Sequence, residues 1–124
     1  LSADAINLRI KKLQQRGVIT GFTVEIDHVK LNQYHYKILL YLNQLSTSKI
    51  APLLNKIRNF NRTTAIIQTL ANWDYEFDIE IENLHQMKQF LMELTTDYSE
   101  IIRDYQIVRI VNMAKYTFFL PDVK

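Results

Sequence analysis

Hydrophobic and polar residues alternate with the period of a β-strand in two long segments of this chain, and two further segments are strand-like. From Trp73 to Ile81 every second residue is aromatic or branched, and every residue between is acidic. Such alternation is typical of a strand that buries one face. The segment from Tyr34 to Asn43 alternates in the same way, Thr63 to Leu70 is rich in β-branched residues, and Ile101 to Ile110 completes the series. We therefore predict four strands between residues 34 and 110.

Two segments between these strands carry apolar residues at the spacing of three and four that marks an amphipathic helix. The stripe of the first helix consists of Ile50, Leu53, Leu54 and Ile57. The stripe of the second consists of Leu84, Met87, Leu91, Leu94 and Tyr98. We expect residues 46–48, Ser-Thr-Ser, to cap the first helix and Asn83 to cap the second. Pro52 is compatible with the first helix only near its first turn.

The resulting order, strand-helix-strand-strand-helix-strand, predicts an α+β fold of the ferredoxin-like type. In that βαββαβ fold an antiparallel sheet carries both helices on one face, so its own chain leaves the other face bare. We expect a partner to cover that face, and a homodimer or higher homo-oligomer is the hypothesis. The apolar residues expected there are Leu39, Tyr41, Tyr105 and Ile107.

The pattern of the first 33 residues predicts a helix, a strand and a linker that are separate from the main domain. Ser2 is a good N-cap for a helix over residues 2–16, and Gly17 ends it. The apolar face of this helix consists of Ala3, Ile6, Ile10 and Leu13. Residues 18–27 are predicted to form a strand and residues 28–33 a linker. Residues 34–124 are then the main domain, in which Met113 to Leu120 is a terminal extension. Because Leu1 directly precedes a helix start, we expect native sequence upstream.

Composition narrows the class of protein. The 124 residues are 48% hydrophobic and 23% charged, as in ordinary globular domains. With no cysteine, disulfides and thiolate metal sites are excluded, and the cytoplasm is the expected compartment. The net charge of +2 is small, but its distribution is uneven. Residues 6–23 carry four basic residues and no acid, whereas residues 73–83 carry five acids and no base.

The first segment resembles the end of the winged helix-turn-helix of the leucine-responsive/asparagine regulator (Lrp/AsnC) family. That pattern has a Leu-Ser turn, a recognition helix with Arg-Ile-x-x-Leu, and then Gly-x-Ile-x-Gly-aromatic. The matching residues are Leu1, Ser2, Arg9, Ile10, Leu13, Gly17, Ile19, Gly21 and Phe22. The βαββαβ remainder is similar to the family's ligand-responsive domain, so the resemblance covers essentially the whole chain and implies a transcription regulator.

The resemblance also implies two sites. Small polar groups and cations on the first helix would contact DNA, and these residues are Ser2, Asn7, Arg9, Lys11 and Lys12. A small-molecule effector, by family analogy an amino acid, would bind near a subunit interface at Ala71, Asn72, Trp73, Asp74 and Tyr75. Family members usually carry Gly-x-x-Asp there, and in this chain the Gly is Ala71. For the chain in isolation we expect weak, salt-sensitive DNA binding at most.

Metal-binding and catalytic motifs find little support in the sequence. The acidic residues of segment 73–83 could bind a hard cation, but pairing with His35, Lys37, Arg103 and Arg109 explains them better. No catalytic triad, His-x-x-x-His spacing or glycine-rich phosphate loop is found, so neither an enzyme nor a resident cofactor is expected. Two alternatives stay open: a stand-alone metabolite sensor without DNA binding, and an enzyme similar to the family's sirohaem-decarboxylase relatives.

Overall fold

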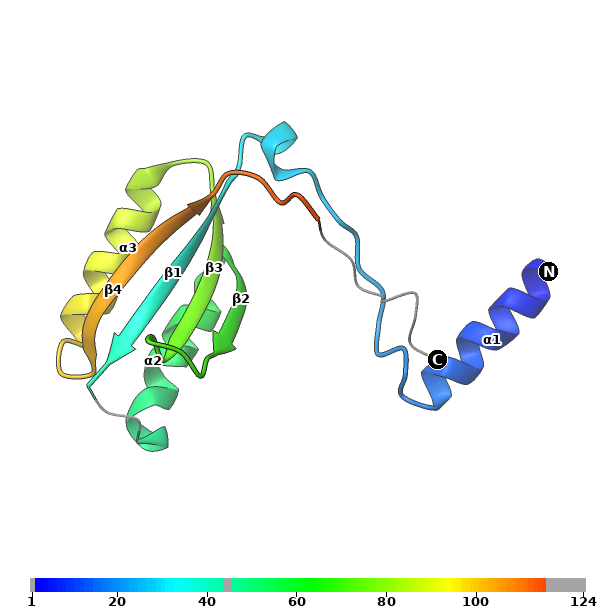
Figure 1. The fold of residues 1–124 in the computed structure, drawn as a ribbon, viewed down its shortest axis with the longest axis horizontal. Coiled ribbons are helices and arrows are strands. Elements are labelled where there is room, and N and C mark those ends of the chain that lie inside the picture. Colours follow the sequence, from blue (N-terminus) through cyan, green and yellow to red (C-terminus); the bar gives the residue numbers. More distant parts are fainter. Residues whose placement is uncertain (1, 44–45, 116–124) are drawn as a thin grey trace.

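The computed structural model describes residues 2–43 and 46–115 of the chain. The elements are, in order, α1 (Ala3–Gln15), the 3-10 helix η1 (His28–Leu31), β1 (Tyr34–Leu42), α2 (Thr47–Asn59), β2 (Thr63–Gln68), β3 (Tyr75–Ile81), α3 (Leu84–Asp97) and β4 (Ile102–Ile110) (Figure 1). From β1 onward this is the predicted βαββαβ order. The α+β, ferredoxin-like fold class is confirmed.

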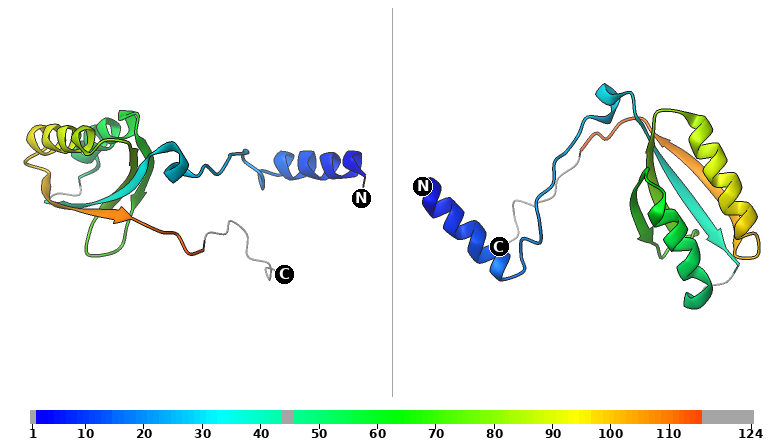
Figure 2. Two further views of the ribbon diagram at one scale, coloured as in Figure 1. Left: turned by 90° about the horizontal axis from the view of Figure 1, so that it is seen from above. Right: turned by 180° about the vertical axis from the view of Figure 1, so that it is seen from behind.

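The four strands form one antiparallel sheet in the order β2-β3-β1-β4. Both α2 and α3 lie on one face of this sheet, as the view from above in Figure 2 shows. Neither helix covers the opposite face, which we call the open face. The register assigns to the open face His35, Lys37, Leu39 and Tyr41 of β1, Glu76, Asp78 and Glu80 of β3, and Gln106, Val108 and Ile110 of β4.

The hydrophobic core fills the space between the sheet and the two helices. Its buried side chains include Tyr36, Ile38, Leu40, Phe77, Ile79 and Ile81 from the central strands and Ile50, Leu53, Ile57, Met87, Phe90, Leu91 and Leu94 from the helices. Each large apolar side chain removed from water contributes about 1.5–3 kcal/mol. Phe90 stacks on Phe60 with ring centroids 4.0 Å apart and meets Phe77 edge-on at 6.3 Å. The helices are thus fixed to the sheet by side-chain packing.

The predicted apolar stripes are largely the buried ones, with two differences. Leu84, the first residue of α3, is exposed, and Phe90, which we did not include, is buried. Phe90 lies three residues after Met87 and therefore on the same helical face. Asn83 caps α3 as predicted, since its side chain accepts a hydrogen bond from the His85 N–H at 2.8 Å.

The start of α2 differs from expectation. Ser46 occupies the N-cap position, but its side chain makes no capping hydrogen bond. Pro52 does not lie in the first turn, because α2 begins at Thr47 and places the proline in the second turn. A proline there lacks the N–H that would donate to the Ser48 carbonyl. Burial of Leu53, beside it, favours the helix despite that loss.

The first helix is formed as predicted. The Ser2 hydroxyl accepts a hydrogen bond from the Ala5 N–H at 3.3 Å, which caps α1. At the other end Gly17 adopts a left-handed φ of 68° and donates to the Gln14 carbonyl at 2.9 Å. This conformation costs glycine nothing because it has no Cβ. No residue of α1 is buried, and Figure 1 shows the helix standing apart from the sheet and its two helices.

The predicted strand over residues 18–27 is wrong. That segment has no regular structure, and Val18, Phe22 and Val24 are exposed. A strand requires a neighbour that pairs with its N–H and C=O groups, and the sheet of the described residues does not include this segment. The predicted linker 28–33 holds η1, which is capped by the Asp27 side chain through the Lys30 N–H at 3.4 Å and ends at left-handed Asn32.

Two of the four residues predicted to lie on the bare face lie on the other face. Tyr105 pairs with buried Leu40 and Ile107 pairs with buried Ile38, so both side chains are on the helix side of the sheet. They remain partly exposed because β4 is an edge strand. The pairing of β1 with β4 shifts register at Tyr41, and strand alternation alone does not determine which face a strand presents to the core. The predicted extension after Met113 lies mostly outside the described residues.

Candidate effector and nucleic-acid surfaces

The turn between β2 and β3, where the effector site is predicted, is fixed by a set of short hydrogen bonds. The Thr69 N–H donates to the Asp74 carbonyl at 3.0 Å, and the Thr69 hydroxyl donates to the Trp73 carbonyl at 2.6 Å. Asp74 then joins the turn to β1. Its N–H donates to the Leu40 carbonyl at 2.9 Å, and its carboxylate accepts from the Leu42 N–H at 2.7 Å.

The five predicted effector residues do not share one surface within the chain. Ala71 and Asn72 are exposed at the tip of the turn. The Trp73 indole N–H donates to the Glu76 carboxylate at 3.1 Å, on the open-face side. Tyr75 packs against the core on the helix side. A ligand held by Trp73 and one held by Tyr75 would therefore occupy opposite sides of the sheet.

On the helix side, Tyr75 lines a cavity of about 220 Å³. The other lining residues are Thr47, Ile50, Ala51, Leu54 and Gln68, from α2 and β2. This cavity is smaller than a usual small-molecule site. Its polar groups are two hydroxyls and one amide, so it has no charged group to pair with the ammonium or carboxylate of an amino acid.

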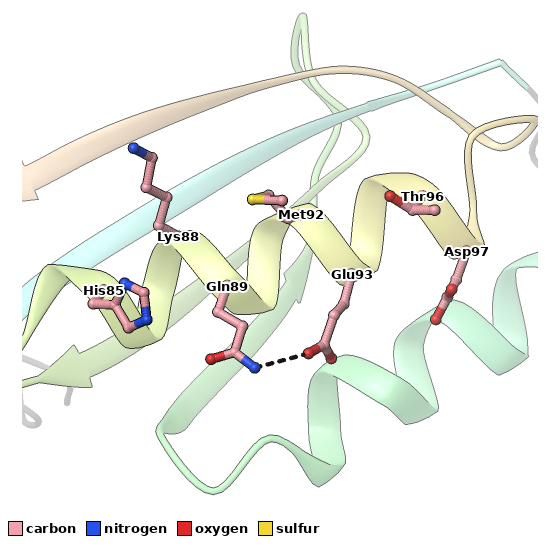
Figure 3. A pocket seen from close by; sticks show the side chains of 7 residues that line it. All are labelled: His85, Lys88, Gln89, Met92, Glu93, Thr96 and Asp97. Carbon is pink, nitrogen blue, oxygen red and sulfur yellow. Dashed lines mark hydrogen bonds between the residues drawn. The ribbon is translucent and has the colours of Figure 1, made fainter.

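A larger hollow, of about 410 Å³, runs along the outer side of α3. All of its lining residues belong to this one helix, as Figure 3 shows: His85, Lys88, Gln89, Met92, Glu93, Thr96 and Asp97. Gln89 donates a hydrogen bond to Glu93 at 3.3 Å within it. Because one helix covers a ligand from one side only, this hollow lacks the enclosure of a small-molecule site.

The open face carries a row of close contacts between the carboxylates of β3 and basic side chains of its neighbours. Lys37 pairs with Glu76 and lies 3.2 Å from Asp78, and the His35 ring lies 3.1 Å from the Asp78 carboxylate. The predicted pairing of the acidic strand with His35 and Lys37 is thus confirmed. The side chains of Glu76 and Asp78 are only 12% and 15% exposed, although no helix covers them.

A further contact in this row was not predicted from the sequence. The His28 ring Nδ1 lies 2.6 Å from the Glu80 carboxylate, which links η1 to β3. The sequence gives no signal for it, because His28 falls in the predicted linker and the path of a linker is not encoded in a periodic pattern. We call the three carboxylates of β3 together with Lys37, His28 and His35 the charge row.

The electrostatics of the charge row are clearest at Lys37. Partial burial lowers the pKa of its ammonium, but the hydrogen bond to Glu76 and the nearby Asp78 carboxylate outweigh this, so the pKa is raised above 10.5. Arg103 and Arg109 do not join the row, which corrects our prediction. Their guanidinium groups lie over the rings of Tyr41 and Tyr34, at 5.8 and 4.6 Å, in cation–π contacts.

The residues predicted to contact DNA lie on the exposed surface of α1. Asn7 and Lys11 are four residues apart and share one face, and Arg9 and Lys12 are three apart on an adjacent face. All four are exposed. Ser2 is exposed as well, but its hydroxyl is engaged as the helix cap. The structure therefore brings three cations and an amide together on one helix.

Two features are absent from the described part of the chain. Within residues 2–43 and 46–115, no three His, Asp or Glu side chains are grouped so that they could hold a metal ion. Over the same residues, no helix combines the length and apolar character needed to cross a membrane.

Comparison with known proteins gives one sequence relative that spans the whole chain. The HTH-type transcriptional regulator Ptr1 of Methanocaldococcus jannaschii is 28% identical over 125 residues, which cover 100% of this chain and 76% of the relative. No family model matches the chain.

Solved structures agree over nearly the full length. An AsnC family transcriptional regulator from Agrobacterium tumefaciens superposes with a TM-score of 0.78 at 20% identity, over 98% of this chain and 78% of its own. A transcriptional regulator from Neisseria meningitidis in complex with L-Met gives a TM-score of 0.79 at 16% identity, with the same coverage. Escherichia coli AsnC gives 0.75 at 17% identity, over 96% and 78%. The resemblance inferred from the sequence is therefore confirmed: this chain has the fold of the Lrp/AsnC regulators and is similar over its whole length to an HTH-type transcriptional regulator.

Proposed function

We propose that this chain acts as a DNA-binding transcription regulator of the Lrp/AsnC type, in which the βαββαβ domain senses a small metabolite. The observation that carries the proposal is the combination of an exposed basic helix and a ferredoxin-like domain in one chain that matches such regulators from end to end. A DNA-binding role places the chain with the genome, in the cytoplasm. It is a regulatory and not a catalytic role.

Self-association through the open face is the second part of the proposal. Leu39 is on this face and yet is only 8% exposed, and Tyr41, Val108 and Ile110 extend an apolar strip beside it. A second copy is the natural occupant, because a two-fold dimer presents two basic helices to a partly palindromic operator. The resemblance extends this to rings of dimers.

Val108 and Ile107 provide a matched test of that pairing. They are neighbours in β4 with similar exposure, 40% and 44%, but their side chains point to opposite faces of the sheet. We expect Val108→Asp to weaken dimerisation at least about tenfold, since it buries a charge in the interface. Ile107→Asp should leave the dimer intact. Analytical ultracentrifugation over a dilution series measures both, and equal effects of the two substitutions would refute pairing through the open face.

The proposed effector is an amino acid or a similar small metabolite, bound between subunits beside the β2–β3 turn. This is supported by the resemblance and by the L-Met complex of the Neisseria meningitidis regulator. Asn72 and Trp73 are available there, while the Asp74 carboxylate already accepts a hydrogen bond from the Leu42 N–H. We therefore propose that one carboxylate oxygen of Asp74 fixes the turn through the Leu42 N–H and that the other oxygen contacts the ligand.

Trp73 is the only tryptophan of the chain and reports directly on this turn. We expect an effector to change Trp73 fluorescence and to raise the melting temperature in a screen of the amino acids. Asn72→Ala should weaken the response, whereas Gln89→Ala, on the outer side of α3, should not. A thermal shift that leaves Trp73 fluorescence unchanged and is abolished by Gln89→Ala would place the effector in the hollow of α3.

Measuring the affinity for a DNA duplex distinguishes this proposal from the alternative, a metabolite sensor that does not bind DNA. A sensor of that kind would show the thermal shift but no salt-dependent affinity for a DNA duplex. The exposed cations of α1 favour the regulator, because a stand-alone sensor has no use for them. A sirohaem-decarboxylase-like enzyme would instead show an absorption band on addition of the tetrapyrrole.

A further inference from the structure

The charge row on the open face contains two imidazoles, each within contact distance of a carboxylate. His28 Nδ1 lies 2.6 Å from Glu80, and His35 Nε2 lies 3.1 Å from Asp78. The side chains of His28 and His35 are 34% and 23% exposed. Both ring nitrogens are buried atoms, and neither contact has the geometry of a hydrogen bond. The contacts are therefore attractive only when the ring is protonated and positively charged.

The formal charge of the row depends on those two rings. Its three carboxylates face one ammonium, that of Lys37. With both imidazoles neutral the row carries two net negative charges, and with both protonated it is neutral. Imidazole is the side chain whose ordinary charge change falls between about pH 5 and pH 8. The net charge of the row therefore depends on whether these two rings carry a proton.

Most neighbours of the row within the sheet are uncharged. On the β4 side, the register places Val108 beside Lys37 and Ile110 beside His35. On the β2 side, Ala65 lies beside Asp78 and Ile67 beside Glu76. Arg62 precedes β2 and lies beside Glu80, whose N–H donates to the Arg62 carbonyl at 3.0 Å. The other charges lie farther out: Lys30 of η1 pairs with Asp27, Arg103 and Asp104 lie by Tyr41 at the far end of β1, and Glu82 is exposed beyond β3.

In a two-fold pair, each open face meets a copy of itself, so like net charges meet. We propose that protonation of His28 and His35 strengthens pairing through the open face, which makes assembly of this chain sensitive to pH. The inference rests on the proposed pairing and adds its regulation. Because His28 belongs to η1, its contact with Glu80 also brings η1 against β3.

The test measures dimer dissociation constants of the full chain by sedimentation at about pH 5.5 and about pH 8, at one ionic strength. We expect the constant to be at least about tenfold lower at the acidic pH, with a smaller difference in high salt. The double variant His28→Gln/His35→Gln should lose the difference. His85→Gln should keep it, because His85 is an exposed residue of α3.

A second variant tests the charge without removing the histidines. Glu80→Gln/Asp78→Asn removes two negative charges at every pH, and it should pair at about pH 8 as tightly as the unmodified chain does at about pH 5.5. A dimer with equal dissociation constants at both pH values overturns this inference and leaves the proposed pairing intact. So does a pH dependence that survives in both double variants. A monomer at all pH values overturns the pairing itself and the inference with it.

Discussion

The carboxylate of Asp74 accepts a hydrogen bond from the backbone N–H of Leu42 at 2.7 Å. This contact joins the β2–β3 turn to the end of the central strand, 32 residues away along the chain. It also gives the conspicuous acidic residue of the turn a structural role, independent of any ligand. A buried donor that loses its acceptor costs more than the hydrogen bond itself contributes.

We therefore expect Asp74→Ala to lower the free energy of unfolding by about 1–3 kcal/mol, because the Leu42 N–H is left without an acceptor. Asp74→Asn retains an acceptor and should cost less. Asn72→Ala, at the exposed tip of the same turn, should stay within about 0.5 kcal/mol of the unmodified chain. Urea denaturation measures all three. Equal stabilities of Asp74→Ala and Asn72→Ala would show that the contact does not hold the turn.

Sequence periodicity predicted the fold well where one face of an element is buried by its own chain. The alternation in β3 and the stripes of α2 and α3 determine which residues enter the core, so these elements were found almost to the residue. Residues 18–27 alternate too, but Val18, Phe22, Val24 and Ile26 are exposed, no strand of the described residues pairs with the segment, and the strand is not formed. Alternation in the sequence indicates that a segment can form a strand, but the strand forms only where a neighbouring strand pairs with it.

The candidate sites were predicted less completely, for a related reason. The cations of α1 follow from helical spacing alone. The split of the predicted effector residues between the two sides of the sheet follows from the bend of the turn at Trp73 and Asp74, which no periodicity encodes. The contact of His28 with Glu80 depends on the path of a connecting segment. Long-range contacts of single side chains are visible only once the register is known.

Lys37 is expected to stabilise the sheet through the two carboxylates beside it. Lys37→Met leaves Glu76 and Asp78 without their ammonium partner and should lower the free energy of unfolding by about 1–3 kcal/mol near neutral pH. Lys49→Met, an exposed residue of α2, is the control and should change stability little. A loss in Lys37→Met no larger than in the control would contradict the role of the pair.

The same lysine predicts a dependence on alkaline pH. Its folded-state pKa is raised above 10.5 because Glu76 and Asp78 outweigh the effect of partial burial. A raised pKa means that the folded state holds the proton more tightly than the unfolded state does. The stabilisation is therefore fully present below pH 10.5 and is lost as the pH rises through the higher folded-state value. The difference in free energy of unfolding between the unmodified chain and Lys37→Met should shrink over that range. A difference that grows with pH would mean that the pKa of Lys37 is lowered by folding, contrary to this prediction.

Core packing predicts a contrast between two leucines. Leu53 of α2 is completely buried, whereas Leu70 is fully exposed in the β2–β3 turn. Leu53→Ala should lower the free energy of unfolding by about 2–5 kcal/mol, from lost burial and the cavity left behind. Leu70→Ala should change it by less than about 0.5 kcal/mol. Thermal and urea denaturation test the pair. A large effect at Leu70 would indicate that another copy or segment covers the turn.

The basic surface of α1 predicts how affinity for DNA depends on salt. Lys11 and Lys12 are exposed cations that would neutralise phosphates, and each contact releases counterions, adding about 0.9 to the slope of log affinity against log salt. Lys11→Ala/Lys12→Ala should weaken binding to a duplex and reduce the slope by about 2. Lys49→Ala/Lys88→Ala removes the same charge from α2 and α3 and should leave the slope unchanged. Fluorescence anisotropy at several salt concentrations measures the slope for both variants. Because the two variants have the same net charge, a slope that falls only in Lys11→Ala/Lys12→Ala indicates phosphate contacts on α1. Equal slopes in the two variants would contradict such contacts.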